Sequence, residues 1–514
     1  MAAVVAIVVA LTRLLAADDG LAVRRVQLGT LPLTVFSPAA ATGPAGPAPP
    51  VVVIAHGFAG SQQLMQPFAL TLARNGYIAV TFDFPGHGRN AAPMFGGLVD
   101  PPESQRVLLA ALETVGAYAA GLGDRSGHYA VLGHSMASDI VVRHAQAHPA
   151  VPATVAVSLF APSITANTPA DSPRNLLVIT GALEPAMMSR EALRVAAQGG
   201  GPGPGQAAVP GRTYGRFADG TARRVEFSPG AEHIGVLYSP HTQAQALAWL
   251  DQAFGRPPAA APFIDAPGRM LGLLLAGIVV LAWPLARTLP RLAPPARLRM
   301  GVGRSRWGRV WPLVLAPAVA TPLLLWKLPM DFMPLLLGDY LALHFGVYGL
   351  LTAALLVRGG WRLPRARAGR DLALVGAALA ATAFAVLAIG IPVDRFVFNV
   401  QPTEVRWPLI GMMCAGTLPY FLADEWFARD PQAPPAAYFV SKLCFLLSLV
   451  AAIALNPPRL FFLALIVPAI LLLFIVYGLF SRWIHRATGS ALVAAIANGV
   501  AFGSFIAVTF PLVR

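Results

Sequence analysis

The chain has 514 residues, of which 56% are hydrophobic and only 12% are charged, and its mean hydropathy is +0.61. This composition excludes an ordinary soluble protein, and the length exceeds that of one compact domain. The formal net charge of +14 would suit a nucleic-acid binder, but the arginines gather in short loops between apolar runs, as in membrane proteins, so we expect no nucleic-acid partner.

The chain begins with an apolar segment, MAAVVAIVVALTRLLAA, over residues 1–17, interrupted by Arg13. Its apolar core is short, as in a secretory signal, so residues 1–20 are predicted to be a transmembrane anchor or a cleaved signal-like segment. A buried helix of a cytoplasmic domain is the alternative.

Residues 21–260 are predicted to form an α/β domain, because short apolar strands alternate there with amphipathic stretches. Runs such as VVVIA suit parallel strands that are buried on both faces. The alternation predicts a mostly parallel sheet with helices on both faces. The predicted strands lie within residues 51–60, 77–90, 128–138, 154–162, 175–184 and 223–233.

The third of these strands runs into Gly-His-Ser-Met-Ala at 133–137, just before an amphipathic stretch. A serine on such a sharp strand-to-helix turn is lifted out of the sheet, and small residues on either side relieve crowding. Gly133 and Ala137 occupy those positions, and we expect the methyl group of Ala137 to be tolerated. The alternative is that Ser135 only caps the following helix.

Four stretches match the α/β-hydrolase superfamily in order: His56-Gly57, residues 133–137, the strand that ends near Glu184, and the Glu-His-Ile-Gly segment around His233. The chain therefore resembles this superfamily over about residues 25–255. In members of the superfamily the catalytic serine comes first in the chain, the acid second and the histidine last. The resemblance implies that Ser135 is the nucleophile, His233 the general base and Glu184 the acid that orients the histidine. It implies no cofactor and no metal in the site.

Other residues compete for two of these roles. His128 and His241 are alternative bases, although His241 begins a helical stretch and is expected to face solvent, and His134 is read as a packing or rim residue. Asp171 precedes the relevant strand and fits poorly as the acid, and Asp83 is expected to order a turn. For Glu184 itself, the alternative is an exposed loop carboxylate.

The resemblance also implies an oxyanion hole made by the backbone amides of Met136 and Phe58. His56 and Gly57 would shape the loop that carries Phe58, with Gly57 allowing a positive φ. An equally good interpretation of His56 is a buried core histidine.

Many lipases carry a helical lid after the strand that corresponds to residues 154–160. Here only residues 161–174 connect this strand to the next one, so no large lid is expected. The Gly/Pro-rich insert at 195–220 reads as a flexible loop. An open site favours acyl or lipid-like esters. Apolar residues near the predicted site either line an acyl pocket or belong to the core: Phe58, Met65, Met94, Phe95, Met136, Met187 and Met188.

Residues 266–514 are predicted to form an all-α polytopic membrane domain, because long apolar runs alternate with charged loops. Three ionisable residues are expected at membrane depth: Asp339 and His344 in the third run, and Lys442 in the sixth. Such residues either stabilise helix packing or form an ion path, and we expect the packing role. The eight candidate spans are about 268–287, 310–327, 333–357, 371–392, 407–423, 437–455, 460–480 and 489–511.

Arginine placement predicts the orientation, because basic residues concentrate in cytoplasmic loops. The α/β domain is then extracytoplasmic, in an integral protein of a bacterial-type plasma membrane. Asp424 and Glu425 are expected at the cytoplasmic end of the fifth span. The arginines used are those after the first span (Arg287, Arg291, Arg297, Arg299, Arg304, Arg306, Arg309), the third (Arg358, Arg362, Arg365, Arg367, Arg370) and the seventh (Arg482, Arg486).

Together these features predict a membrane-anchored serine hydrolase that cleaves carboxylic esters through an acyl-serine intermediate, with a small-molecule or lipid-like substrate and the bilayer as its partners. Two alternatives remain open. One is an acyltransferase that uses the same serine with a lipid donor or acceptor. The other is a transporter or scaffold with an inert α/β domain.

Overall fold

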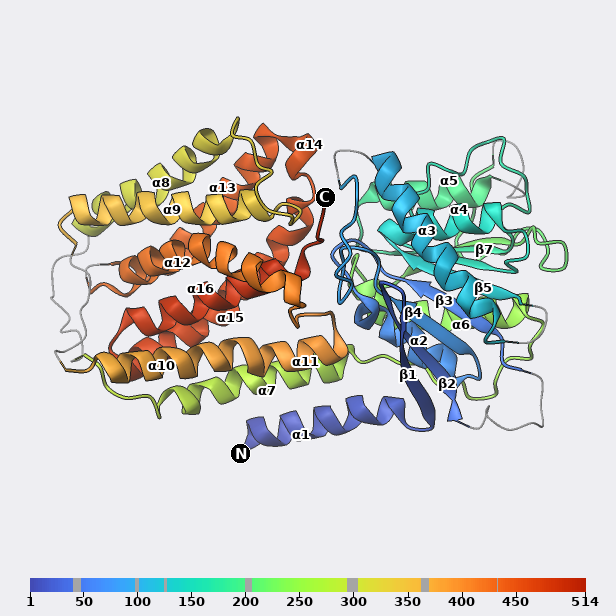
Figure 1. Ribbon diagram of the computed structural model, residues 1–514, viewed down its shortest axis with the longest axis horizontal. Coiled ribbons are helices and arrows are strands. Elements are labelled where there is room, and N and C mark those ends of the chain that lie inside the picture. The colour runs from blue at the N-terminus through green and yellow to red at the C-terminus, as the bar shows by residue number, and fades with distance from the viewer. Residues whose placement is uncertain are drawn as a thin grey trace. The chain divides into compact units, whose positions relative to one another are not determined.

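The computed structural model describes residues 1–39, 48–97, 101–123, 127–198, 206–293, 304–361, 369–431 and 433–514 (Figure 1). They divide into two compact units. An α/β unit contains Val8–Leu273, Asp394–Asn399 and Pro511–Arg514, and a helical unit contains Met1–Ile7, Leu274–Val393 and Val400–Phe510. The α/β unit thus includes two short segments, 394–399 and 511–514, that the sequence had placed in the membrane domain.

The α/β unit is built on one eight-stranded sheet with the strand order β1-β2-β4-β3-β5-β6-β7-β8. The pairs from β4 to β8 are parallel, while β2 pairs antiparallel with both β1 and β4. The mostly parallel sheet predicted from the sequence is confirmed. The strands are β1 (Leu21–Leu28), β2 (Leu31–Pro38), β3 (Val51–Ala55), β4 (Ile78–Phe82), β5 (Tyr129–His134), β6 (Thr154–Val157), β7 (Leu176–Gly181) and β8 (Arg223–Ser228).

The β1–β2 hairpin was not among the predicted strands. Leu28 pairs with Leu31, so the connection is the two-residue turn Gly29-Thr30, in which Gly29 has a φ of 60°. A two-residue turn with a glycine in this conformation is typical of hairpins. Strand β1 lies at the sheet edge and is largely exposed, which is why it lacks the apolar run of the central strands.

Helices cover both faces of the sheet, as predicted, because successive side chains of a strand point to opposite faces. On one face, Val52 and Ile54 of β3 pack with α2 (Gln66–Arg74) and α6 (Pro240–Ala253). On the other, Val51 and Val53 pack with α3 and α4. Full burial of each such side chain contributes roughly 1.5–3 kcal/mol. The helices of the second face are α3 (Pro101–Ala120), α4 (Met136–Ala147) and α5 (Ala186–Ala197).

In the helical unit and its connection to the α/β unit, seven helices are long and apolar enough to cross a membrane, counted over the described residues. Four of them coincide with single helices: α7 (Gly268–Ala286), α9 (Gly338–Arg358), α13 (Ala437–Leu455) and α16 (Ala491–Thr509). Two are parts of longer helices, namely Trp307–Leu325 in α8 (Arg304–Leu325) and Ile466–Thr488 in α15 (Leu463–Thr488). The seventh, Asp371–Phe396, consists of α10 (Asp371–Ala383), a π-helical turn (Phe384–Ala388) and α11 (Ile389–Phe396). The one-turn α14 (Pro457–Leu460) precedes α15.

The remaining predicted span, 407–423, falls on α12 (Trp407–Arg429), which is long but is not among the seven. Its neighbours approach closely through small residues: a Cβ on Gly416 would lie 2.1 Å from the carbonyl oxygen of Ala342 in α9, and one on Gly503 of α16 would lie 2.7 Å from Cys414. Small residues of this kind let membrane helices pack closely. Whether α12 crosses a bilayer stays a prediction.

Most of the ionisable residues noted in the spans have partners. Lys442 forms an ion pair with Asp424 at 2.6 Å, and Glu425 one with Arg429 at 2.9 Å. Asp339 accepts a hydrogen bond from the backbone of Met333, outside α9. Asp424 and Glu425 are buried within the unit, with exposed fractions of 4% and 1%. These contacts fit the favoured interpretation that such residues stabilise helix packing.

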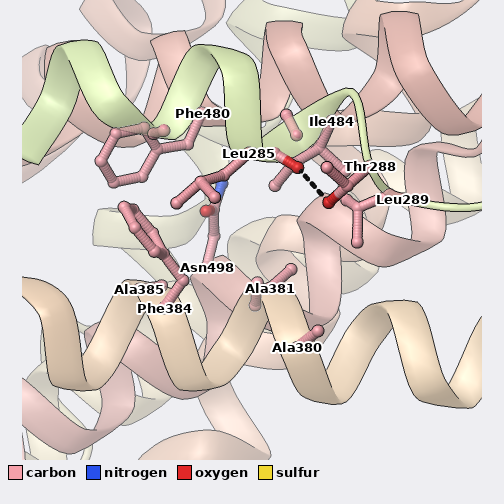
Figure 2. A pocket seen from close by; sticks show the side chains of 13 residues that line it. Leu285, Thr288, Leu289, Ala380, Ala381, Phe384, Ala385, Phe480, Ile484 and Asn498 are labelled. Atoms are coloured by element: carbon pink, nitrogen blue, oxygen red, sulfur yellow. Dashed lines mark hydrogen bonds between the residues drawn. The ribbon is translucent and has the colours of Figure 1, made fainter. Parts of the chain in front are cut away.

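A cavity of about 230 Å³ in the helical unit is lined by α7, α10, α15, α16 and the π-helical turn (Figure 2). Alanine, leucine and phenylalanine side chains dominate its lining, and Asn498 is one of its few polar members. No residue of the predicted catalytic site takes part in it.

The N-terminal segment folds as α1 (Ala2–Leu15), whose 14 residues are fewer than the roughly 20 that a helix needs to span the hydrocarbon core. Its role as anchor or signal stays a prediction. Part of the basis for the predicted orientation lies outside the described residues, namely Arg297, Arg299, Arg362, Arg365 and Arg367. Residues 199–205 of the Gly/Pro-rich insert also lie outside the described residues.

Candidate active site

Ser135 lies on the sharp turn between β5 and α4, with a φ of 52° and a ψ of −115°. A non-glycine residue in such a conformation costs roughly 1–3 kcal/mol and is often found at functional sites. The side chain makes no capping hydrogen bond to the helix, which contradicts the alternative that Ser135 is only an N-cap.

The residues on either side of the turn explain how the chain turns so sharply. A Cβ on Gly133 would lie 2.5 Å from the carbonyl oxygen of Ala137, so only glycine fits there. Ala137 itself is fully buried among the core residues between the sheet and α3. Its methyl group is accommodated, as predicted for this departure from the G-x-S-x-G pattern.

Ser135, His233 and Glu184 come together in one hydrogen-bonded series. The Ser135 Oγ lies 3.0 Å from Nε2 of His233, and Nδ1 of His233 lies 2.7 Å from Oε2 of Glu184. The three residues follow β5, β8 and β7, whose carboxyl ends lie at one edge of the sheet. This edge is where open α/β sheets place their sites.

Glu184 is held in place by two further donors. The Ser158 hydroxyl and the Gly181 N–H both donate to Oε1, each at 2.7 Å. Burial would raise the pKa of Glu184, but the hydrogen bonds from His233, Ser158 and Gly181 outweigh it and hold the pKa below its ordinary value. The carboxylate is therefore ionised and buried, not the exposed loop carboxylate of the alternative.

His134 supports the loop that carries His233. Its Nε2 lies 3.0 Å from the backbone oxygen of His233, and the two rings are 5.0 Å apart. A carbonyl oxygen only accepts, so Nε2 carries the proton. Burial and the neighbouring His233 lower the pKa of His134 to about 3, so the ring is neutral. The predicted packing role thus becomes a specific one, because His134 helps to position His233.

His56 is a buried histidine with both ring nitrogens in contact with the backbone. The N–H of Phe84 donates to Nε2 at 3.1 Å, so Nδ1 carries the proton and donates to the Gly57 oxygen at 2.8 Å. Burial lowers its pKa. The structure therefore supports both interpretations at once, since this core histidine also ties the loop after β3 to the loop after β4.

The expectation of a positive φ at Gly57 is wrong. The left-handed residue of this turn is Ala59, with a φ of 53°. Glycine is needed at position 57 for space, because a Cβ there would lie 3.0 Å from Nδ1 of His134 and 3.0 Å from the Ser135 Cβ. The loop thus approaches the serine turn as closely as backbone allows.

The two amides assigned to an oxyanion hole come from the segments next to Ser135. Met136 is the first residue of α4, so its N–H has no acceptor within the helix. Phe58 lies in the turn that follows β3, and β3 is the neighbour of β5 in the sheet. Their role in binding an oxyanion stays a prediction.

The competing residues lie elsewhere or have other partners. His241 belongs to α6 and faces Glu226 at 3.5 Å, and His128 precedes β5, at the end of that strand opposite Ser135. Asp171 lies in the connection before β7. Asp83 accepts hydrogen bonds from the backbone of Gln62 and Arg89, which is the turn-ordering role expected for it.

Sequence reasoning missed Ser158. It follows β6 directly and stands beside Ser135, whose N–H donates to the Val157 oxygen. The sequence could have indicated it, because Ser158 is a polar residue at the carboxyl end of β6, the strand that neighbours β5. Its hydroxyl orients the carboxylate that in turn orients His233.

The apolar residues proposed near the site fall into two groups. Met65 and Met94 belong to the core, with exposed fractions of 0% and 2%, so they are not free to line an acyl pocket. Phe95 and Met187 are exposed, and Phe58, Met136 and Met188 are half-buried.

Four large apolar side chains are exposed next to the site residues in sequence, by 44–67%. We call them the apolar rim; they are Phe160, Leu183, Met187 and Ile234. Residues 158–175, all described, contain no helix, so no helical lid follows β6.

A comparison with protein families matches residues 46–197 to the family described as serine aminopeptidase, S33. No curated protein matches the chain. The matched segment contains Ser135 and Glu184 and ends before His233. It supports a hydrolase.

Solved structures similar to the chain cover about half of it. TT1662 from Thermus thermophilus is 17% identical, with a TM-score of 0.33, over 46% of this chain and 99% of that one. A putative dienelactone hydrolase from Klebsiella pneumoniae subsp. pneumoniae is 17% identical, with a TM-score of 0.32, over 46% and 100%. A bacterial membrane phospholipase A is 13% identical, with a TM-score of 0.31, over 49% and 93%.

The sheet order, the serine on its strand-to-helix turn and the family match over residues 46–197 show that the α/β unit has an α/β-hydrolase-like fold, in a chain whose described residues also include seven helices apolar enough to span a membrane.

Proposed function

We propose that this protein is a membrane-anchored serine hydrolase that cleaves carboxylic esters of an acyl or lipid-like kind. The observation that carries the proposal is the hydrogen-bonded series from Ser135 through His233 to Glu184, with distances of 3.0 and 2.7 Å. A serine hydroxyl is a weak nucleophile until such a base accepts its proton. An inert scaffold would have no need to maintain this arrangement on a strained turn.

In the proposed reaction, Ser135 Oγ attacks the ester carbonyl carbon while Nε2 of His233 takes the hydroxyl proton. The resulting oxyanion is bound by the N–H groups of Met136 and Phe58. The C–O bond to the alcohol breaks, and His233 returns the proton to the leaving oxygen. Water, deprotonated by His233, then attacks the acyl carbon; the bond from that carbon to Ser135 Oγ breaks, His233 returns the proton to Oγ, and the carboxylic acid is released. Ionised Glu184 stabilises the imidazolium at both stages.

The substrate class is inferred from the surroundings of the site. The apolar rim places exposed hydrocarbon next in sequence to the site residues that follow β6, β7 and β8, and exposed apolar groups of this kind often mark binding surfaces. An acyl chain would bury them. Because no helical lid follows β6, a bulky or bilayer-derived ester would have direct access to Ser135.

Two alternatives use the same acyl-serine. An acyltransferase would pass the acyl group to an alcohol instead of water. An aminopeptidase, suggested by the description of the matched family, would need an anionic group for the substrate's α-amino group. The exposed acid nearest to His233 in sequence is Glu232, whose carboxylate accepts hydrogen bonds from the N–H groups of Ile234 and Gly235. The ester proposal is preferred because of the apolar rim.

We expect the purified full-length chain to hydrolyse p-nitrophenyl esters and to prefer long acyl chains to short ones. The substitution Phe160→Ser should lower kcat/KM for the long ester by about 5- to 30-fold, since losing one buried aromatic contact costs about 1–2 kcal/mol, and should leave the short ester nearly unchanged. The matched control is Val209→Ser, an equally exposed apolar residue away from the site residues in sequence.

Two further arms of this experiment separate the alternatives. Faster turnover of aminoacyl p-nitroanilides than of esters would favour the aminopeptidase. Transfer of the acyl group to an added alcohol in preference to water would favour the acyltransferase. Absence of turnover on every ester would contradict the proposal.

We also propose that the hydrolase domain faces the outside of the cytoplasm, in a bacterial-type plasma membrane. The prediction is tested with single cysteines in a chain whose Cys414 and Cys444 are replaced by alanine. Asp219→Cys, in an exposed turn of the α/β unit, should react with an impermeant maleimide in intact cells. Arg358→Cys, at the exposed end of α9, should react only after permeabilisation. The reverse pattern would overturn the orientation.

A further inference from the structure

A cluster of three potential metal ligands lies on the helical face formed by α3 and α4. Glu113 is on α3, His144 is in the last turn of α4, and His148 follows at the end of that helix. One ligand atom from each residue lies within 4.8 Å of the others. A single ion can therefore reach all three with small side-chain adjustments.

The fold brings these residues together for simple reasons. His144 and His148 are four positions apart, one helical turn, so their rings share one side of the helix and their centroids are 4.4 Å apart. Helices α3 and α4 pack together on the same face of the sheet. Glu113 therefore comes from the neighbouring helix, and the cluster joins two elements.

His144 is the buried member and the one that points to a ligand. Its exposed fraction is 1%, and its Nε2 lies 2.8 Å from the Tyr129 hydroxyl. Its Nδ1 is also buried and, in the part of the chain that the structure describes, has no hydrogen-bond partner. Buried polar atoms in native proteins are nearly always paired, so a bound ion would explain this arrangement.

Tyr129 resembles the outer partner that metal-binding histidines commonly have. Space for its hydroxyl is left by Gly116 of α3, where a Cβ would lie 2.2 Å from the hydroxyl oxygen.

We propose that Glu113, His144 and His148 bind one divalent transition-metal ion of the zinc type. Two imidazoles and one carboxylate suit Zn²⁺, Ni²⁺ or Cu²⁺, whereas Ca²⁺ and Mg²⁺ prefer all-oxygen sites. Water would complete the coordination, because only three protein ligands meet here among the described residues.

The ion has a structural role, separate from ester cleavage. Tyr129 begins β5 and Ser135 directly follows that strand, six positions and about 20 Å further along, so the cluster lies at the opposite edge of the sheet from the serine. By joining α3 to the end of α4, the ion stabilises the helix whose first residue is Met136.

The test uses the full-length chain in detergent, purified without a polyhistidine tag and stripped with a chelator. We expect Zn²⁺ titrated by calorimetry to bind with one-to-one stoichiometry and to raise the melting temperature. His148→Ala and Glu113→Gln, both at exposed positions, should each weaken Zn²⁺ binding at least tenfold and remove the rise. Tyr129→Phe should weaken binding about 10- to 100-fold, as loss of an outer partner does.

The matched control is His241→Ala, a histidine outside the cluster, which should bind Zn²⁺ like the wild type. Ester turnover of His148→Ala at a temperature where it is folded should equal that of the stripped wild type. Zn²⁺ binding unchanged by both His148→Ala and Glu113→Gln would overturn the proposal, as would an equal rise in melting temperature with Ca²⁺.

Discussion

Replacement of Ser135 by alanine is expected to abolish covalent labelling of the chain by a fluorophosphonate and to lower ester turnover by about 10⁴-fold or more. The reagent captures an activated serine hydroxyl, and Ser135 is the hydroxyl that His233 contacts at 3.0 Å. Without this hydroxyl the chain can still bind the ester and stabilise an oxyanion, but it cannot form the acyl-serine intermediate. Labelling is read by gel fluorescence and turnover by p-nitrophenol release.

The matched control is Ser138→Ala, which removes the other serine of the same turn. The Ser138 hydroxyl is buried and donates to the backbone oxygen of Ser135 at 2.6 Å, so it is not open to the reagent. We expect this variant to be labelled like the wild type. Labelling that survives in Ser135→Ala would eliminate the proposed nucleophile, and a wild-type chain that is never labelled would favour an inert α/β domain.

Glu184→Gln should lower kcat by about 10³- to 10⁴-fold with little change in KM, because the amide reverses a hydrogen bond. The carboxylate accepts a hydrogen bond from the protonated Nδ1 of His233, which leaves Nε2 free to act as a base toward Ser135. An amide nitrogen at Oε2 would donate to Nδ1 instead. The proton would then sit on Nε2, the wrong nitrogen for removing the serine proton.

The same variant should alter how stability depends on pH. The pKa of Glu184 in the folded chain lies below its ordinary value of 4.5, so ionisation of this group favours folding. That contribution is complete above the ordinary value and is lost as the pH falls through the folded-state pKa. The difference in melting temperature between wild type and Glu184→Gln should therefore shrink as the pH is lowered from about 6 to about 3.

Glu232→Gln serves as the control for both measurements. Glu232 is exposed and its carboxylate accepts only the backbone N–H groups of Ile234 and Gly235 among the described residues. We expect near wild-type kcat. A Glu184→Gln chain that keeps wild-type kcat would show that this carboxylate does not orient His233.

Local features of the sequence were sufficient for much of the α/β unit. Continuous apolar runs in β3 to β7 can only be buried on both faces, which predicts central parallel strands under two layers of helices. The order of Ser135, Glu184 and His233 after three of the predicted strands supported the resemblance to the α/β-hydrolase superfamily, and that resemblance implied which residues meet. The β1–β2 hairpin escaped prediction because its edge strand is largely exposed.

Other parts of the site depended on distances between segments far apart in the chain. The role of Gly57 was predicted as a backbone conformation, but it proved to be the close approach of two loops, with Ala59 taking the positive φ. Met65 and Met94 belong to the core, which composition alone does not distinguish from a pocket. Ser158 orients Glu184 only because β6 lies between β5 and β7.

The sequence by itself determined the two-part character of this protein and the identity of its three proposed catalytic residues, because hydrophobic periodicity and strand-end motifs are local properties. The tertiary structure decided how those residues are supported and revealed a second cluster at Glu113, His144 and His148. Those contacts arise from the packing of α3 beside α4 and of one strand end beside another. The separation of 26 residues along the chain between Ser158 and Glu184 leaves no local pattern from which their contact could be predicted.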